Sequence, residues 1–152
     1  MTMESTTTDT LYPVFAIPST EPENEDVEQT FKPSPLFDYD KGDFVRDGAN
    51  RIVMVDGRDA YILWVLKALK TQQGACLSYM GVGVDHEGAL AEPSREAVQA
   101  AFERGISEAL LTHPCTDRVY DFNFEWDSDT LYTAFTVKPK AWAAFDIAMN
   151  VV

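Results

Sequence analysis

Two histidines and two cysteines carry the side chains that zinc prefers, imidazole and thiolate. They are Cys76, His86, His113 and Cys115. Their spacing matches no zinc-finger or zinc-ribbon pattern, and His113 and Cys115 flank Pro114, a residue that ends helices. We therefore expect no metal site. Two cysteines also make no disulfide framework, so both are expected to be thiols, although a single bridge between them stays open.

A second set of residues could carry acid–base chemistry. Asp85-His86-Glu87 lies in a glycine-rich stretch, and Glu87 with Glu92 offers the pair of carboxylates that glycoside hydrolysis needs. No serine or cysteine nucleophile accompanies His86 in a recognisable motif, so a solvated loop histidine is the simpler interpretation. Acidic pairs are common at this composition, and Gly81-Val82-Gly83 lacks the glycine and lysine of a phosphate-binding loop. The sequence favours a protein without catalysis or cofactor.

The net charge limits the classes of partner. The chain has 152 residues, enough for one domain with a core, and its 25 acidic and 12 basic residues give a net charge of −13. Such a surface repels nucleic-acid phosphates and anionic membranes. No apolar run approaches the roughly 20 residues of a membrane span, and no basic segment leads into a signal-peptide core. We expect no nucleic acid, no membrane and a cytosolic location.

Residues 1–35 are predicted to form an extended N-terminal arm. Pro13, Pro18, Pro22 and Pro33 exclude a long helix there. The arm holds a short apolar piece, LYPVFAIP, followed by the acidic stretch EPENEDVEQ. The apolar side chains would dock only where the body or a partner offers a groove, and a disordered tail fits the composition equally well.

The body, residues 36–152, is predicted to open with a hairpin and a helix. Residues 44–46 and 52–55 flank the turn residues Gly48 and Asn50, and Asp56 suits the N-cap of a helix over 58–70 that Gly74 can stop. Another chain or the arm is expected to cover the second apolar side of this helix. The main stripe is Tyr61, Ile62, Val65, Leu66 and Leu69, and the second side carries Leu63 and Trp64.

Two further elements precede the C-terminal sheet. ACLSYM, residues 75–80, has the pattern of a strand, and the glycine-rich stretch after it is predicted to be a connection. Pro93 and Ser94 then open the clearest helix of the sequence, 94–112, with Ser94 as N-cap and Pro114 at its end. Its apolar residues recur at helical spacing, which predicts one buried face.

Residues 118–137, RVYDFNFEWDSDTLYTAFTV, predict a hairpin with the two-residue turn Ser128-Asp129. Residues 145–151 alternate again and predict a third strand. The fold class is therefore α+β: a small antiparallel or mixed sheet packed against two main helices, with helix 94–112 over the aromatic face. The register expected for the hairpin puts Trp126 opposite Leu131, Phe124 opposite Thr133, Phe122 opposite Phe135 and Tyr120 opposite Val137.

The order of several motifs carries a family resemblance. The opening F-D-x-D-x-G-D-F, the V-D-G-x-x-A entry to the first helix, Tyr79 with Gly83, and an E-A-L helix end before RVYDFNFEW follow one another. Together they resemble the baseplate wedge and sheath-initiator family of contractile-tailed phages, in particular its branch in prophages of Gram-positive bacteria, once labelled lysozyme-like. The resemblance runs from about residue 36 to the C-terminus.

That resemblance implies a non-enzymatic subunit of the virion baseplate, assembled in the host bacterial cytoplasm and present in several copies around the tail tube. There it templates the first ring of sheath, and strands from sheath subunits complete its sheet. The implied partners are the tail sheath protein, baseplate wedge proteins and tube or hub proteins. Relatives usually carry a charged residue in the turn after the first helix, where this chain has Gln72 and Gln73. The wedge contact is therefore expected to be made differently.

The open edges of the predicted sheet are the candidate sheath-binding surface, because edge strands leave backbone groups unpaired. The alternatives are a peptidoglycan hydrolase that uses two carboxylates with His86, and a cytosolic protein-interaction adaptor. We expect sheath contacts along 118–126 and 144–151. The sheath-binding candidates are Val119, Asp121, Asn123, Glu125, Phe145, Ile147 and Met149, and the wedge-binding candidates are Leu63, Trp64, Gln72 and Gln73.

Overall fold

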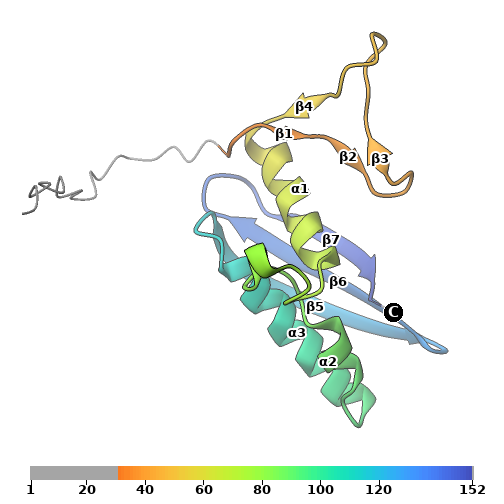
Figure 1. The fold of residues 1–152 in the computed structure, drawn as a ribbon. Coiled ribbons are helices and arrows are strands. Elements are labelled where there is room, and N and C mark those ends of the chain that lie inside the picture. The colour runs from red at the N-terminus through yellow and green to blue at the C-terminus, as the bar shows by residue number, and fades with distance from the viewer. Residues whose placement is uncertain (1–30, 152) are drawn as a thin grey trace, which may run out of the picture.

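The computed structural model describes residues 31–151, so most of the predicted arm, with its apolar piece at 11–18, and Val152 lie outside the described residues. The described chain has the predicted α+β fold. A three-stranded antiparallel sheet has the order β5-β6-β7, and helices α1 and α3 pack against one face of it (Figure 1). The main elements are α1 (Gly57–Lys70), α2 (His86–Leu90), α3 (Arg95–Leu111), β5 (Thr116–Asp127), β6 (Thr130–Pro139) and β7 (Phe145–Asn150).

Helix α1 begins after Asp56, whose extended backbone is that of an N-cap, although its side chain makes no capping hydrogen bond. The helix ends at Lys70, so the predicted bounds 58–70 are confirmed within one residue, although its C-cap is Thr71 and not Gly74. Thr71 Oγ1 donates to the Lys67 carbonyl at 2.6 Å and competes with continuation of the helix. Three residues of the predicted stripe, Tyr61, Val65 and Leu69, are buried, together with Ala60 and Ala68.

Helix α3 starts where the sequence predicts. Ser94 Oγ accepts a hydrogen bond from Ala97 N at 3.1 Å and satisfies a backbone group that the first turn leaves free. Phe102, Ile106 and Leu110 are fully buried in the core, and the helix packs against β5. Helix α3 therefore covers the aromatic face, as predicted, and burial of apolar surface at about 25 cal/mol per Å² holds the two layers together.

The segment before α3 differs from its prediction. Residues 75–80 form no strand, because Leu77–Tyr79 is a single 3-10 turn, and Leu77 and Met80 are 87% and 63% exposed. A strand needs a partner, and none of the described strands pairs with this run. The stretch predicted as a plain connection contains α2, because Asp85 caps this short helix by accepting a hydrogen bond from Gly88 N at 3.0 Å.

The β5–β6 hairpin has the predicted turn, and its tip has the predicted register, including Trp126 opposite Leu131. Nearer the other end the predicted register is wrong, because a β-bulge between Tyr120 and Asn123 puts an extra residue into β5. Tyr120 thus lies opposite Thr136 and Val119 opposite Val137, whereas Phe122 keeps its expected partner, with its ring stacked 5.1 Å from that of Phe135. Asp121 takes a positive φ of 57° within the bulge.

Strand β7 is the predicted third strand. Phe145 lies opposite Val137, Ile147 opposite Phe135 and Met149 opposite Thr133, in one unbroken register. The sheet is therefore antiparallel throughout, and both β5 and β7 are edge strands.

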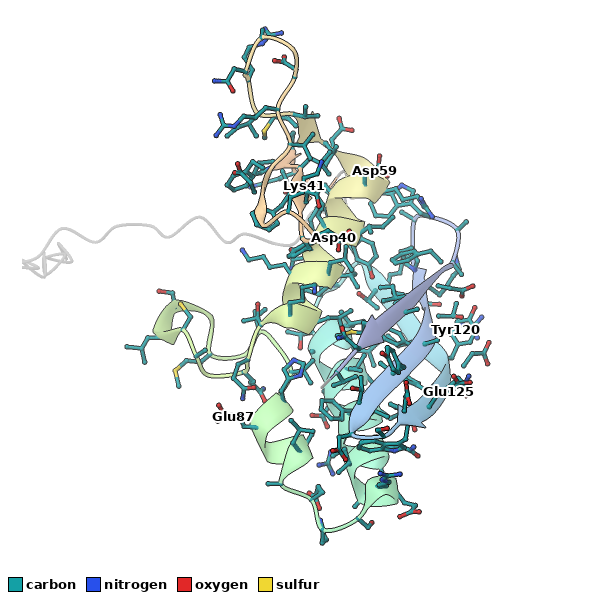
Figure 2. The ribbon with its side chains drawn as sticks, turned by 90° about the vertical axis from the view of Figure 1, so that its right-hand side faces the viewer. Asp40, Lys41, Asp59, Glu87, Tyr120 and Glu125 are labelled. Carbon is teal, nitrogen blue, oxygen red and sulfur yellow. The ribbon has the colours of Figure 1, made fainter. Side chains whose placement is uncertain are left out.

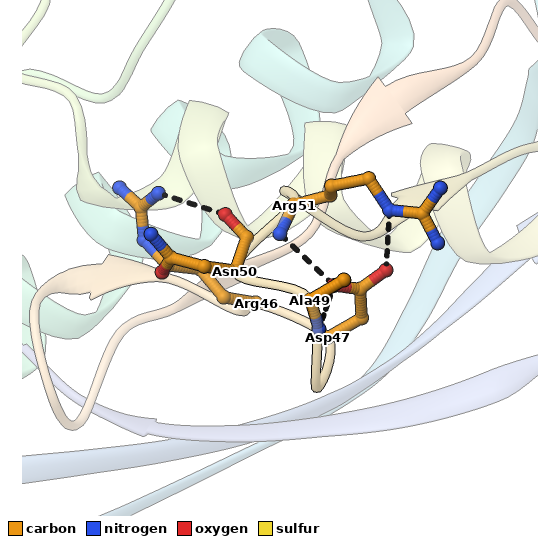
Figure 3. Close-up of polar contacts among 5 residues, drawn as sticks. All are labelled: Arg46, Asp47, Ala49, Asn50 and Arg51. Carbon is orange, nitrogen blue, oxygen red and sulfur yellow. Dashed lines mark hydrogen bonds and ion pairs between the residues drawn. The ribbon is translucent and has the colours of Figure 1, made fainter.

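Within the described residues, four two-residue strands precede α1, and the loop between the last two depends on Asp47. Asp47 Oδ1 accepts hydrogen bonds from Ala49 N at 2.8 Å and Arg51 N at 2.9 Å (Figure 3). The predicted hairpin is present: Arg46 and Ile52 form a bridge, and Val53 N donates to the Val45 carbonyl at 2.9 Å. Its outer parts pair elsewhere, because β1 (Ser34–Pro35) pairs with β4 (Met54–Val55) and β2 (Phe37–Asp38) pairs with β3 (Asp43–Phe44).

Candidate functional site

The outer edge of β7 is a row of backbone groups that no described strand pairs. Val151 N donates to the Leu131 carbonyl at 2.8 Å, which fixes the phase of the ladder between β6 and β7. In an antiparallel pair, alternate residues point their backbone groups to opposite sides. The N–H and C=O groups of Asp146, Ala148 and Asn150 therefore point away from β6, toward the open side of the sheet.

The edge of β7 is more regular than the edge of β5. Every residue of β7 pairs with β6 in one register, whereas β5 carries a bulge at Asp121. A bulge interrupts the ladder that an added strand would form. Helix α3 also packs beside β5, where Arg95 Nη2 donates to the Ser128 carbonyl at 2.9 Å. Strand β7 is thus the edge that is better suited to receive another strand.

The face of the sheet opposite the helices is exposed and holds three of the predicted sheath residues. Asn123 and Glu125 are exposed on β5, and Asp121 is exposed at the bulge. Figure 2 shows Tyr120 and Glu125 on this side of the molecule. A shallow hollow of about 490 Å³ lies across this face and reaches the edge of β7. It is lined by Asn123, Glu125, Tyr132, Thr133, Ala134, Ala148, Met149 and Asn150.

The other four predicted sheath residues point toward the core. Ile147 is only 7% exposed, and Val119, Phe145 and Met149 are half-buried and pack against the core. The Arg58 guanidinium lies 5.6 Å from the centroid of the Phe145 ring. These side chains hold β7 against the helices, so their contribution is to position the edge. Strand β7 itself was predicted correctly. Its exposed residues, however, are Asp146, Ala148 and Asn150, which alternate with the predicted Phe145, Ile147 and Met149.

The second apolar side of α1 lines a groove. Leu63 and Trp64 form one wall, and residues of β1, β2 and β3 form the other, around a volume of about 430 Å³. The Trp64 ring lies 4.6 Å from the His113 ring and 6.0 Å from the Tyr61 ring, centroid to centroid. The predicted wedge residues Leu63 and Trp64 are therefore half-buried by the chain's own residues. An apolar hollow remains between α1 and the short strands.

The predicted wedge residues after α1 have different environments. Gln72 Nε2 donates to Asp85 Oδ1 at 2.9 Å, and Gln72 Oε1 accepts from His86 N at 3.0 Å. Gln72 thus joins the end of α1 to the start of α2. The backbone of Gln73 donates to the Val84 carbonyl at 3.0 Å, but its side chain is exposed. Of the two, Gln73 is the one that a partner can reach.

Asp85 is the centre of this junction. Its carboxylate accepts hydrogen bonds from Gly88 N and from the Gln72 amide, and these bonds, the backbone bond first, hold its pKa below the usual 3.8. Gly83 nearby has a φ of 110°, and a Cβ there would overlap the Thr71 carbonyl oxygen. Only glycine fits this close approach, which gives the Tyr79 and Gly83 motif a structural explanation at its second residue.

The residues with catalytic or metal-binding side chains are dispersed. His86 Nε2 lies 2.9 Å from the Leu69 carbonyl oxygen, and the centroid of the His86 ring lies 5.7 Å from that of Phe102. His86 was expected to be a solvated loop residue, but it is half-buried at the start of α2. Glu87 is exposed on α2, on the side of the molecule away from the sheet (Figure 2). Cys76 is exposed and Cys115 is buried, both as thiols. Residues 31–151 contain no cluster of three metal-ligating side chains.

Within the part of the chain that the structure describes, no helix is long and apolar enough to cross a bilayer. A search of the curated proteins finds no match to the chain. The family model of contractile injection system sheath initiators matches residues 34–140, from β1 to just after β6, with β7 beyond the matched range. Because this match spans well over half of the sequence, the chain belongs to the contractile injection system sheath initiator family, a family of structural proteins that initiate the sheath.

Proposed function

We propose that this protein starts sheath assembly by accepting a strand from a sheath subunit at the edge of β7. The observation that carries the proposal is the regular, unpaired backbone edge at Asp146, Ala148 and Asn150. An extended segment that adds to such an edge gains main-chain hydrogen bonds, and pockets for alternate side chains give specificity. The hollow beside β7 offers space for side chains of the added strand.

We also propose that the protein has a fixed position in the particle. Copies of the chain sit in a ring in the baseplate, around the tube and hub proteins, and contact wedge proteins through the groove at Leu63 and Trp64 and through Gln73. Membership of the sheath initiator family supports a place at the end of the sheath. The mechanism is geometric, because each copy fixes where one sheath strand begins.

The protein acts without catalysis in this proposal. His86 is held by the Leu69 carbonyl, and Glu87 is exposed to solvent on a short helix. Both positions are thus poor for the hydrolase alternative. We expect no cell-wall hydrolysis from the unsubstituted chain, and none from a chain with His86→Gln and Glu87→Gln.

Substitution Ala148→Pro tests strand addition. Proline removes the outward N–H of Ala148 but no bond to β6, and edge strands tolerate proline where the N–H faces solvent. We expect the affinity for the sheath subunit to fall about tenfold or more, because one hydrogen bond contributes about 0.5–1.5 kcal/mol and the ring obstructs the incoming strand. Electron microscopy of sheath polymerised in the presence of the chain and tube measures the number of assemblies that start at this protein.

Ala148→Thr is the matched control, because threonine keeps the N–H and favours a strand. It should start sheath as well as the unsubstituted chain does. Circular dichroism and thermal unfolding establish that both variants retain the fold. Normal sheath initiation by a folded Ala148→Pro chain would refute strand addition at β7.

A further inference from the structure

The groove beside α1 has the shape and lining of a site for an extended peptide. Five of its nine lining residues are aromatic, and its volume of about 430 Å³ lies within the range of about 300–1,000 Å³ that is common for ligand pockets. Aromatic-lined grooves bind extended, proline-containing segments, because such segments lose little conformational entropy on binding. The lining residues are Phe31, Ser34, Pro35, Phe37, Tyr39, Phe44, Leu63, Trp64 and Lys67.

The lining of the groove differs in charge from the whole chain. Lys67 is the single charged residue in the described lining of the groove, although the chain has a net charge of −13. Lys70, one turn further along α1, lies with its Nζ 5.4 Å from the centroid of the Tyr39 ring, which forms part of the wall. A ligand for this groove is therefore apolar and carries negative charge next to the apolar part.

The chain itself contains a segment with this chemistry, immediately before the groove. Residues 11–17, LYPVFAI, are apolar, include Pro13 and are followed by Pro18. Five acidic residues follow within 21–28, and the first 31 residues contain no lysine or arginine. The sequence order is thus apolar piece, acidic piece and then Phe31, which is a wall of the groove.

We propose that the apolar piece at 11–17 of the same chain binds in the groove beside Leu63 and Trp64, with the acidic piece near Lys67 and Lys70. The intervening residues reach easily, since an extended chain spans about 3.3–3.6 Å per residue and the groove begins at Phe31 itself. A short flexible tether gives an effective concentration in the mM range, so even a weak contact is occupied. A wedge protein that uses this groove must then displace the arm.

This inference does not depend on strand addition at β7, because the groove and the β7 edge use different residues. Disulfide trapping in the full chain tests it. Val14→Cys is combined with Leu63→Cys in a Cys76→Ser background, which removes the exposed native thiol. Under mild oxidation we expect a disulfide within one chain, seen as a faster-migrating monomer on a non-reducing gel.

The control pairs Val14→Cys with Leu90→Cys, a position that is 42% exposed on α2, at the end of the molecule far from β1–β3 (Figure 1). Trapping at Leu63 should be about tenfold faster than trapping at Leu90. Adding Phe15→Asp to the Leu63 pair should slow trapping to the control rate, whereas Thr7→Asp, which adds the same charge before the apolar piece, should leave it unchanged. Thermal unfolding verifies that the variants fold.

Three outcomes would overturn the inference. Equal trapping rates at Leu63 and Leu90 would mean that the arm does not bind the groove. Disulfide-linked dimers in place of the cyclised monomer would assign the groove to the arm of a second copy. Fast trapping that Phe15→Asp does not slow would show that proximity along the chain, not apolar binding, brings the two thiols together.

Discussion

The burial of His113 predicts that the stability of this protein depends on pH just below neutrality. Its ring lies 4.6 Å from that of Trp64 and 5.1 Å from that of Phe31, and its Nδ1 accepts a hydrogen bond from Cys115 N at 3.1 Å. Burial lowers the pKa of His113 from the usual 6.5, because loss of solvent disfavours the charged imidazolium. Protonation of Nδ1 would also remove the acceptor for Cys115 N.

We expect the free energy of unfolding to decrease as the pH falls below about 6.5, the pKa of an unperturbed histidine. The unfolded chain takes up the proton at a higher pH than the folded chain, so stability falls between that value and the lower pKa of folded His113. Urea unfolding at about pH 7.5 and about pH 5.5 measures the change. An NMR titration of the imidazole protons gives the folded pKa, and a value at or above that of the unfolded histidine would contradict the prediction.

His113→Gln is the control for this effect, since it removes the titrating group. The variant should lose the part of the pH dependence that lies near pH 6. Asp47 and Asp85 do not obscure the result, because backbone hydrogen bonds lower both pKa values from 3.8 and their contribution is lost only at more acidic pH.

Individual residues were predictable where a local rule decides their role. Ser94 was recognised as an N-cap because its position before a periodic apolar run leaves few alternatives. The bonds of Gln72 to Asp85 and of His86 to Leu69 were not predictable, since they join residues more than ten positions apart through the tertiary fold. The sequence could not predict that the backbone N–H of Ala148 points away from the sheet. This depends on which residues of β7 form hydrogen bonds with β6.

At the scale of elements, periodicity predicted what is long and amphipathic. Helices α1 and α3, the β5–β6 hairpin and β7 each present a repeated apolar pattern to one core. Short elements failed, because a run such as 75–80 has too few residues to distinguish a strand from a turn, and α2 depends on the single cap Asp85. The residue type of Asp85, which is favoured at the N-cap, is the one local signal that indicates α2.

The bulge in β5 determines which side chains of its first half face the core. Asp121 has a φ of 57°, a conformation that aspartate tolerates and β-branched residues avoid. We expect Asp121→Val to lower the free energy of unfolding by about 1–2 kcal/mol, and Asp121→Gly to be neutral or stabilising. Urea unfolding compares the two. Asn123→Val, on the same face but outside the positive-φ region, is the control and should cost little. Equal stability of the Val and Gly variants at 121 would contradict this account.

At the scale of the whole molecule, the sheet has two unequal edges and one uncovered face. Sequence reasoning could predict that edges exist, because three strands always leave two, but it could not rank them. The ranking depends on the bulge, on the position of α3 beside β5 and on the regular pairing of β7. The uncovered face, with Asn123 and Glu125, is the alternative surface for binding of a sheath subunit.

A pair of variants distinguishes edge binding from face binding. Asn123→Ala with Glu125→Ala removes polar side chains from the open face but changes no backbone group, and exposed substitutions of this kind usually alter stability by less than about 0.5 kcal/mol. If the sheath strand adds to the edge of β7, this double variant should start sheath at nearly the normal rate, because main-chain hydrogen bonds carry most of the affinity. Counting sheath assemblies by electron microscopy, beside Ala148→Pro, gives the comparison. Loss of initiation in the double variant with normal initiation by Ala148→Pro would place the sheath on the open face, and the unpaired edge of β7 would then be a feature of the isolated chain alone.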